Sequence, residues 1–180
     1  MTPAEYVQLK AFARQDGALM ALLWVSSFAC YILGISNPMY TLAALTLMIA
    51  TPFYAARRLR RFRDEDRGGL ISFGRGWAYV VYIFFYASVL LALVQYLYFA
   101  YMDQGYLLSS FTSALSSPEG KQVLEQYGMQ QTAQESLEAM SKMRPIDYAL
   151  NVLTMNIMTG MVLGVPIAAL TKTTAAAERK

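Results

Sequence analysis

Long uncharged apolar stretches dominate this sequence, and four of them approach the length needed to cross a bilayer. A transmembrane helix needs about 20 predominantly apolar residues. The four stretches cover residues 17–35, 39–56, 77–102 and 145–170. Their only charged residue is Asp147, in the first turn of the last stretch, whereas a buried helix of a soluble protein normally keeps one polar face. The pattern therefore predicts an all-α integral membrane protein with four transmembrane helices.

The polar segments between these stretches define the expected parts of the chain. Ser36-Asn37-Pro38 is a turn signal that separates the first two spans. In chain order, the parts are an N-terminal helix at 1–16, a transmembrane hairpin at 17–56, a loop at 57–76, span three at 77–102, a polar segment at 103–144, span four at 145–170 and a tail at 171–180.

Lysine and arginine are distributed unevenly between the two sides of such a protein. The loop over 57–76 shares a side with both termini, because the chain crosses four times. This side holds twelve of the 15 basic residues and has a net charge of +6, whereas the opposite side has a net charge of −3. Cytoplasmic loops of membrane proteins carry the excess of basic residues. Both termini are therefore predicted to be cytoplasmic, and the segment over 103–144 extracytoplasmic.

The first sixteen residues predict a cytoplasmic amphipathic helix rather than a cleaved signal peptide. Acidic Glu5 and Asp16 accompany the basic residues, and no convincing small-residue cleavage site follows the first span. Thr2-Pro3-Ala4-Glu5 has the order of a capping box, with proline at the first helical position. We expect this helix to lie along the cytoplasmic surface before span one.

An arginine-rich run opens the loop between spans two and three. Its six arginines are Arg57, Arg58, Arg60, Arg61, Arg63 and Arg67. They are expected to fix the orientation of the chain and to contact anionic lipid headgroups, at about 1 kcal/mol for each basic residue near the surface. A docking surface for a cytoplasmic partner is the alternative. Nucleic-acid binding is not expected, because aromatic residues do not alternate with the arginines.

A glycine-rich segment connects this run to span three. Neither a preceding strand nor a GK[ST] or GxGxxG spacing accompanies it, so it is not a phosphate-binding loop. We expect an elbow at the membrane interface, with Trp77 in the headgroup belt. The residues assigned to this elbow are Gly69, Ser72, Phe73, Gly74 and Trp77.

The order of a charged loop, the motif Gly69-Leu70-Ile71-Ser72-Phe73-Gly74 and a span resembles the DUF4199 family. These are small four-span bacterial membrane proteins, mostly from Bacteroidota, whose function is not established. The resemblance covers most of the chain, including the glycine-bearing last span and its short basic tail. It implies a multi-pass protein of the bacterial inner (cytoplasmic) membrane, and it brings no catalytic or ligand residues.

The extracytoplasmic segment predicts three short helices. Ser117-Pro118-Glu119 begins the second helix, and a capping box at Thr132–Glu135 begins the third. The segment holds too few large apolar residues for a core of its own. It either caps the bundle or binds a partner, for which Leu137, Met140 and Met143 form the candidate surface, since methionine adapts to varied partners.

Spans three and four carry polar or small residues at membrane depth. Asn156, Gly160, Gly164 and Ala168 recur every four residues in span four and form a small-residue stripe. Such stripes let helix backbones approach closely, either within the bundle or between chains. In span three, Tyr82, Tyr86 and Gln95 sit deeper than an aromatic belt requires. A pocket for a lipid headgroup or a small molecule is therefore an alternative interpretation of these three residues.

Composition excludes most chemistry. The chain has no histidine and a single cysteine, Cys30, so His-based catalysis or metal binding, an intrachain disulfide and a Cys-only metal site are excluded. We expect no enzyme activity and no metal or cofactor. The expected binding partners are membrane lipids, together with a membrane-protein partner or a second copy of the chain. The expected function is an accessory or scaffold subunit of a larger membrane assembly, or a small homo-oligomer. A small transporter or channel, or a lipid-binding protein, is the alternative.

Overall fold

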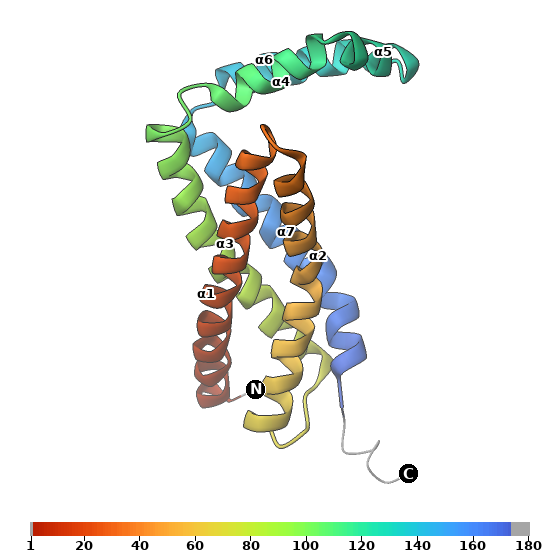
Figure 1. Cartoon of the computed structure of the whole chain (residues 1–180). Helices are drawn as coiled ribbons and strands as arrows, with labels where there is room; N and C mark the ends of the chain where they lie inside the picture. The colour runs from red at the N-terminus through yellow and green to blue at the C-terminus, as the bar shows by residue number, and fades with distance from the viewer. Residues whose placement is uncertain (1, 174–180) are drawn as a thin grey trace. The chain divides into compact units, whose positions relative to one another are not determined.

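A computed structural model describes residues 2–173 of the 180-residue chain and confirms the all-α prediction (Figure 1). No strand occurs among these residues. The helices, in order, are α1 (Pro3–Gly34), α2 (Pro38–Arg61), the π-helical turn η1 (Phe62–Asp66), α3 (Phe73–Tyr101), α4 (Tyr106–Ser116), α5 (Pro118–Gln126), α6 (Gln130–Lys142) and α7 (Pro145–Thr171). Four helices, α1, α2 with η1, α3 and α7, are long and apolar enough to cross a membrane, as expected.

The chain divides into two compact units. The first contains α1, α2, η1, α3 up to Ala92, and α7 from Asn151 onward. The second comprises Leu93–Leu150, which includes α4, α5 and α6. In the first unit, the beginning of α1, the turn η1 and the end of α7 lie at one end, which we call the basic end (Figure 1).

Helix α1 begins with the expected capping box and then runs without a break. The Glu5 backbone N–H donates to Thr2 Oγ1 at 3.3 Å, and the Thr2 N–H donates to a Glu5 carboxylate oxygen at 2.9 Å. Leu9 and Ala13 are fully buried, so the first half of α1 already packs into the bundle. The helix expected at residues 1–16 is therefore part of α1 and not a separate helix along a surface.

Helices α1 and α2 form the predicted hairpin. Asn37 caps α2, since its side-chain oxygen accepts a hydrogen bond from the Met39 N–H at 3.0 Å, and Pro38 occupies the first turn. Gly34 allows the two helices to meet at the turn, because a Cβ on Gly34 would lie 2.5 Å from Thr41 Oγ1. Towards the basic end, Phe62 of η1 stacks on Tyr79 of α3 with ring centroids 4.5 Å apart.

The small-residue stripe of α7 packs against α3. A Cβ on Gly160 would lie 2.4 Å from Phe84 Cβ, and one on Gly164 would lie 3.0 Å from Trp77 Cδ1. Ala168 lies beside Gly76, where a Cβ would meet Ala168 Cβ at 3.4 Å. Close backbone approach of this kind maximises van der Waals packing between membrane helices. Gly160, Gly164 and Ala168 of the stripe are thus packed against α3 within the chain.

The second unit is a short three-helix assembly. Ser117 caps α5, because its hydroxyl accepts from the Gly120 N–H at 3.0 Å, and Gly128 takes a left-handed φ of 64° after α5. Helix α6 begins at Gln130, two residues before the expected cap at Thr132, which lies inside the helix. Neither α5 nor α6 buries any residue completely, as expected for a segment without its own core.

Candidate functional site

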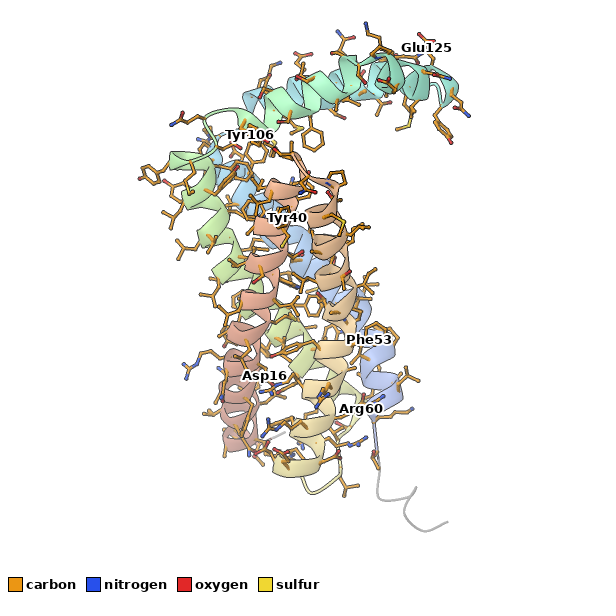
Figure 2. All side chains as sticks on the ribbon, viewed as in Figure 1. Asp16, Tyr40, Phe53, Arg60, Tyr106 and Glu125 are labelled. Carbon is orange, nitrogen blue, oxygen red and sulfur yellow. The ribbon has the colours of Figure 1, made fainter. Side chains whose placement is uncertain are left out.

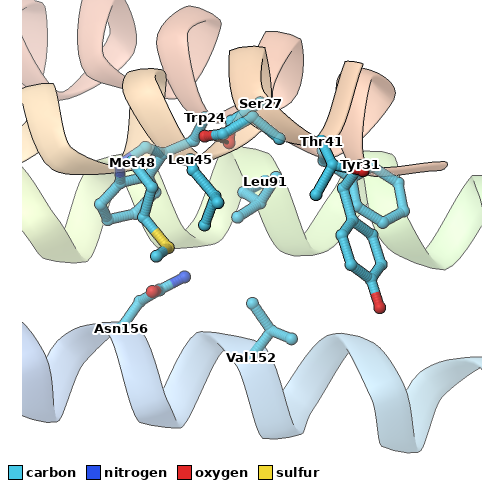
Figure 3. Close-up of a pocket in the computed structure, with 11 residues that line it drawn as sticks. Trp24, Ser27, Tyr31, Thr41, Leu45, Met48, Leu91, Val152 and Asn156 are labelled. Atoms are coloured by element: carbon cyan, nitrogen blue, oxygen red, sulfur yellow. Dashed lines mark hydrogen bonds between the residues drawn. The ribbon is translucent and has the colours of Figure 1, made fainter. Parts of the chain in front are cut away.

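A pocket of about 380 Å³ lies in the first unit, in the half of the bundle near the α1–α2 turn (Figure 3). Ligand pockets in proteins span about 300–1,000 Å³. The walls are mainly apolar and come from four helices. The lining residues are Trp24, Ser27, Phe28 and Tyr31 of α1, Thr41, Ala44, Leu45 and Met48 of α2, Leu91 of α3, and Val152 and Asn156 of α7.

Three polar side chains at this pocket are satisfied by neighbouring helices. Trp24 Nε1 donates to Thr51 Oγ1 at 2.9 Å, and the Ser27 hydroxyl donates to the Ala44 carbonyl at 2.9 Å. The Thr41 hydroxyl donates to the Gly34 carbonyl at 3.2 Å. These hydrogen bonds link α1 to α2. They engage the polar groups of Trp24, Ser27 and Thr41.

Asn156 is different, because its side-chain amide has no hydrogen bond to any residue in the described part of the chain. The amide extends from α7 into the pocket, towards Met48 and Leu91 (Figure 3). A polar group without a partner is unfavourable in an apolar environment. Polar side chains at membrane depth are by default candidates for a functional role. Asn156 is therefore a polar side chain of the pocket lining that is available to a ligand.

A buried ionic cluster joins α1, α2 and α3 at the basic end. The Asp16 side chain is 5% exposed and forms an ion pair with Arg58, whose Nε donates at 2.6 Å. The Tyr79 hydroxyl donates to the second carboxylate oxygen, and the Tyr54 hydroxyl donates to the Asp16 carbonyl at 3.1 Å. Figure 2 shows Asp16 and Arg60 at the same end of the bundle. Asp16 is thus paired and hydrogen-bonded, as a buried charge requires.

A second ionic cluster joins the first turn of α1 to the loop between η1 and α3 and to the beginning of α3. The two Glu5 carboxylate oxygens accept hydrogen bonds from Arg67 Nη2 at 2.7 Å and from Arg75 Nη2 at 2.9 Å. The Nε atoms of both arginines are buried and have no hydrogen-bond partner among residues 2–173. One carboxylate thus anchors two arginines of the basic loop to the first turn of α1.

The predicted headgroup arginines divide into two groups. Arg58 and Arg67 are largely buried in the clusters above, and Arg63 donates to the Thr171 carbonyl at 2.9 Å and pairs with Asp64. Arg61 pairs with Glu65, and both side chains are 59% exposed. Arg57 and Arg60 are exposed and form no ion pair with a described residue. Only part of the run is therefore free to meet lipid headgroups.

The expected elbow is held to the bundle at two points. Gly68 and Gly69 take left-handed φ angles of 61° and 83°, which glycine adopts without strain. Ile71, within the segment expected at the membrane interface, is buried and forms an isolated bridge to Thr173. Trp77, for which a place in the headgroup belt was predicted, donates its Nε1–H to the Met161 carbonyl of α7 at 3.0 Å.

The remaining residues of this segment are accessible. Ser72, Phe73 and Gly74 are exposed, and the backbone carbonyl of Ser72 accepts from the Gly76 N–H at 2.9 Å in the first turn of α3. In the second unit, Leu137 and Met140 of α6 and the residue that caps its C-terminus, Met143, are half-buried. The Met140 carbonyl accepts a hydrogen bond from the Tyr148 hydroxyl at 2.9 Å.

Sequence patterns did not identify the bundle pocket or the Asp16 cluster. Arg58 lies 42 residues beyond Asp16, and the pocket draws on four helices, so neither has a local signature. The position of Asp16 could have indicated the cluster. Asp16 directly precedes an uncharged run, and an acid whose helix continues into the bundle requires a partner.

Within residues 2–173, no group of three or more His, Cys, Asp or Glu side chains is placed to hold a metal ion. Cys30 is half-buried and forms no disulfide.

Comparisons with known proteins give a family without an activity. A family model described as a protein of unknown function (DUF4199) matches residues 15–173. No curated protein and no solved structure matches the chain.

Proposed function

The chain belongs to the DUF4199 family, whose description assigns no activity, and we propose that it is a non-enzymatic membrane protein that binds a lipid-like ligand inside its helix bundle. On length and composition it is a multi-pass membrane protein, with four candidate spans. The observation that carries the proposal is the apolar pocket into which the unpartnered Asn156 amide extends (Figure 3).

The pocket is accessible to molecules dissolved in the bilayer. Leu45 and Met48 line it and are 45% and 59% exposed, so it opens on the lateral surface of the bundle. A ligand with an apolar body and one hydroxyl or carbonyl oxygen would fill the walls and accept a hydrogen bond from the Asn156 amide. Such a bond is favoured in hydrocarbon, where no water competes for the amide.

Composition supports a binding role over catalysis. The sequence has no histidine, and a Ser or Cys nucleophile would therefore lack its usual base. Asp16, the buried acid of the first unit, is engaged by Arg58 and Tyr79 and lies outside the pocket lining.

Photolabelling of the purified full-length protein tests the proposal. A long-chain fatty alcohol with a diazirine in its chain should label peptides that line the pocket. Met48→Trp should reduce this labelling severalfold by filling the pocket. Met155→Trp is the matched control, because Met155 is 60% exposed on α7 and does not line the pocket.

The role of the amide needs a second comparison. Asn156→Leu should lower labelling by the alcohol while preserving labelling by a diazirine alkane of equal length, since only the alcohol can accept the hydrogen bond. Labelling that is spread evenly over the lipid-facing surface and insensitive to Met48→Trp would contradict the proposal.

An accessory role in a larger assembly is the second candidate, and the second unit favours it. Val123, Tyr127 and Met129 are 53%, 68% and 49% exposed, although they lie outside the four apolar helices. Purification in a gentle detergent followed by mass spectrometry of co-purifying chains tests this role. A defined stoichiometric partner or a stable homo-oligomer would support it, and a monomer under every gentle condition would contradict it.

A further inference from the structure

A groove of about 240 Å³ lies on the first unit between α1 and α3, on residues that the bundle pocket does not use. It is lined by Val7, Lys10, Ala11 and Arg14 of α1 and by Tyr86 of α3. Lys10 and Arg14 are one helical turn apart, so both cations face the same hollow.

The packing of α1 on α3 explains why the groove opens at this level. A Cβ on Gly17 would lie 2.7 Å from Tyr86 Cβ and 2.8 Å from the Ile83 carbonyl oxygen, so the two helices almost touch there. One turn earlier in α1 the residues carry longer side chains, and the surface is hollowed between them and the Tyr86 ring.

Aromatic side chains contact two of the residues that line the groove, Lys10 and Tyr86. Lys10 Nζ lies 4.5 Å above the centroid of the Tyr6 ring, and the Tyr6 and Tyr82 hydroxyls are hydrogen-bonded to each other. Tyr82 in turn stacks on Tyr86 with centroids 6.2 Å apart. The groove is thus built by contacts within the chain and does not depend on two isolated surface cations.

No carboxylate of the described chain neutralises these two cations. Neither Lys10 nor Arg14 forms an ion pair, and no acidic residue lines the groove. The two acids nearest in sequence are engaged elsewhere, since Glu5 binds two arginines and Asp16 binds Arg58. The groove therefore keeps a local charge of +2 in an otherwise neutralised neighbourhood.

We infer that this groove binds the phosphate of an anionic phospholipid. Lys10 and Arg14 supply the charge, and the Tyr86 hydroxyl, which has no partner among the described residues, supplies a further donor. Both cations lie within the two turns that precede the uncharged run starting at Gly17, which is the level at which headgroups meet a transmembrane helix. The acyl chains then continue along the apolar surface beyond the groove.

Native mass spectrometry of the full-length protein tests this site by titration with phosphatidylglycerol, phosphatidylcholine or inorganic phosphate. We expect phosphatidylglycerol to bind in preference to phosphatidylcholine. Lys10→Gln with Arg14→Gln should weaken that binding about tenfold to thirtyfold, as expected for the loss of two charges near the surface. The matched control is Arg57→Gln with Arg60→Gln, which removes two exposed, unpaired arginines of α2 and should change binding much less.

Three results would overturn the inference. They are equal affinity for the two lipids, equal weakening by both double variants, and displacement of phosphatidylglycerol by millimolar inorganic phosphate, which would indicate a free-anion site. The fatty-alcohol labelling of the bundle pocket is read separately. The Lys10 and Arg14 substitutions should leave that labelling unchanged, so either idea can fail without the other.

Discussion

Asp16 of α1 and Arg58 of α2 form an ion pair in which the carboxylate is 5% exposed and the guanidinium 20% exposed. The pair lies where the first hairpin meets α3, because Tyr79 donates to the same carboxylate. A single aspartate thus connects three of the four long helices. This connection explains how α1 can carry a charge into the packed bundle directly before its uncharged run.

Removing the carboxylate should therefore be costly. Asp16→Asn leaves the Arg58 guanidinium largely buried without its counter-charge, and we expect a loss of about 3 kcal/mol in the free energy of unfolding. Equilibrium unfolding in mixtures of mild detergent and SDS measures it. The double variant Asp16→Asn with Arg58→Gln should lose less than the sum of the single variants, because it leaves no unpaired charge.

The exposed ion pair Arg61–Glu65 is the control for this experiment. Both side chains are 59% exposed, so Glu65→Gln should change stability by no more than about 0.5 kcal/mol. If Asp16→Asn proved as harmless as Glu65→Gln, the cluster would not join the helices as described.

Two glycine substitutions should act in opposite directions. Gly160→Ala places a Cβ 2.4 Å from Phe84 Cβ, and overpacking of this kind costs about 1–3 kcal/mol. Gly74→Ala meets nothing within 4 Å, so α3 should gain up to about 1 kcal/mol from the better helix propensity of alanine. The same unfolding assay compares them, and a Gly160→Ala variant as stable as Gly74→Ala would contradict the close contact of α7 with α3.

The hydrogen bond from Trp24 to Thr51 should be measurable as a coupling energy. A double-mutant cycle with Trp24→Phe and Thr51→Val separates the bond from the lost ring volume. Interhelical hydrogen bonds in membrane proteins average about 0.6 kcal/mol and reach about 1.7 kcal/mol. We expect a value in this range, since both groups are buried. Additive single effects would show that the bond contributes nothing.

The features that the sequence predicted are those set by neighbouring residues. The four spans follow from the lengths of the uncharged runs, and the Thr2 and Ser117 caps follow from residues three positions apart. The unexpected features depend on residues far apart in the chain. Asp16 meets Arg58 and Tyr79, and Ile71 pairs with Thr173, only because α1, α2, α3 and α7 pack together.

The candidate site illustrates the same division. The spacing of Asn156 with Gly160 and Gly164 indicated one small-residue face of a helix. In the structure the two glycines pack against α3, whereas the Asn156 side chain extends into a pocket. A residue lies about 100° further round the helix for each step in sequence, so a spacing of four drifts by about 40°. Which neighbour each position meets is decided by tertiary packing.

The orientation of the chain in its membrane rests on the distribution of charge and can be tested by cysteine labelling. In a Cys30→Ala background, Arg61→Cys and Gln130→Cys should react with a membrane-impermeant maleimide from opposite sides. Both positions are exposed, and they lie on the segments with net charges of opposite sign. In intact cells stripped of any outer barrier, only residue 130 should be labelled, and residue 61 should react after the membrane is opened. Labelling of both positions from the same side would contradict the four-span topology, and a reversed pattern would contradict cytoplasmic termini.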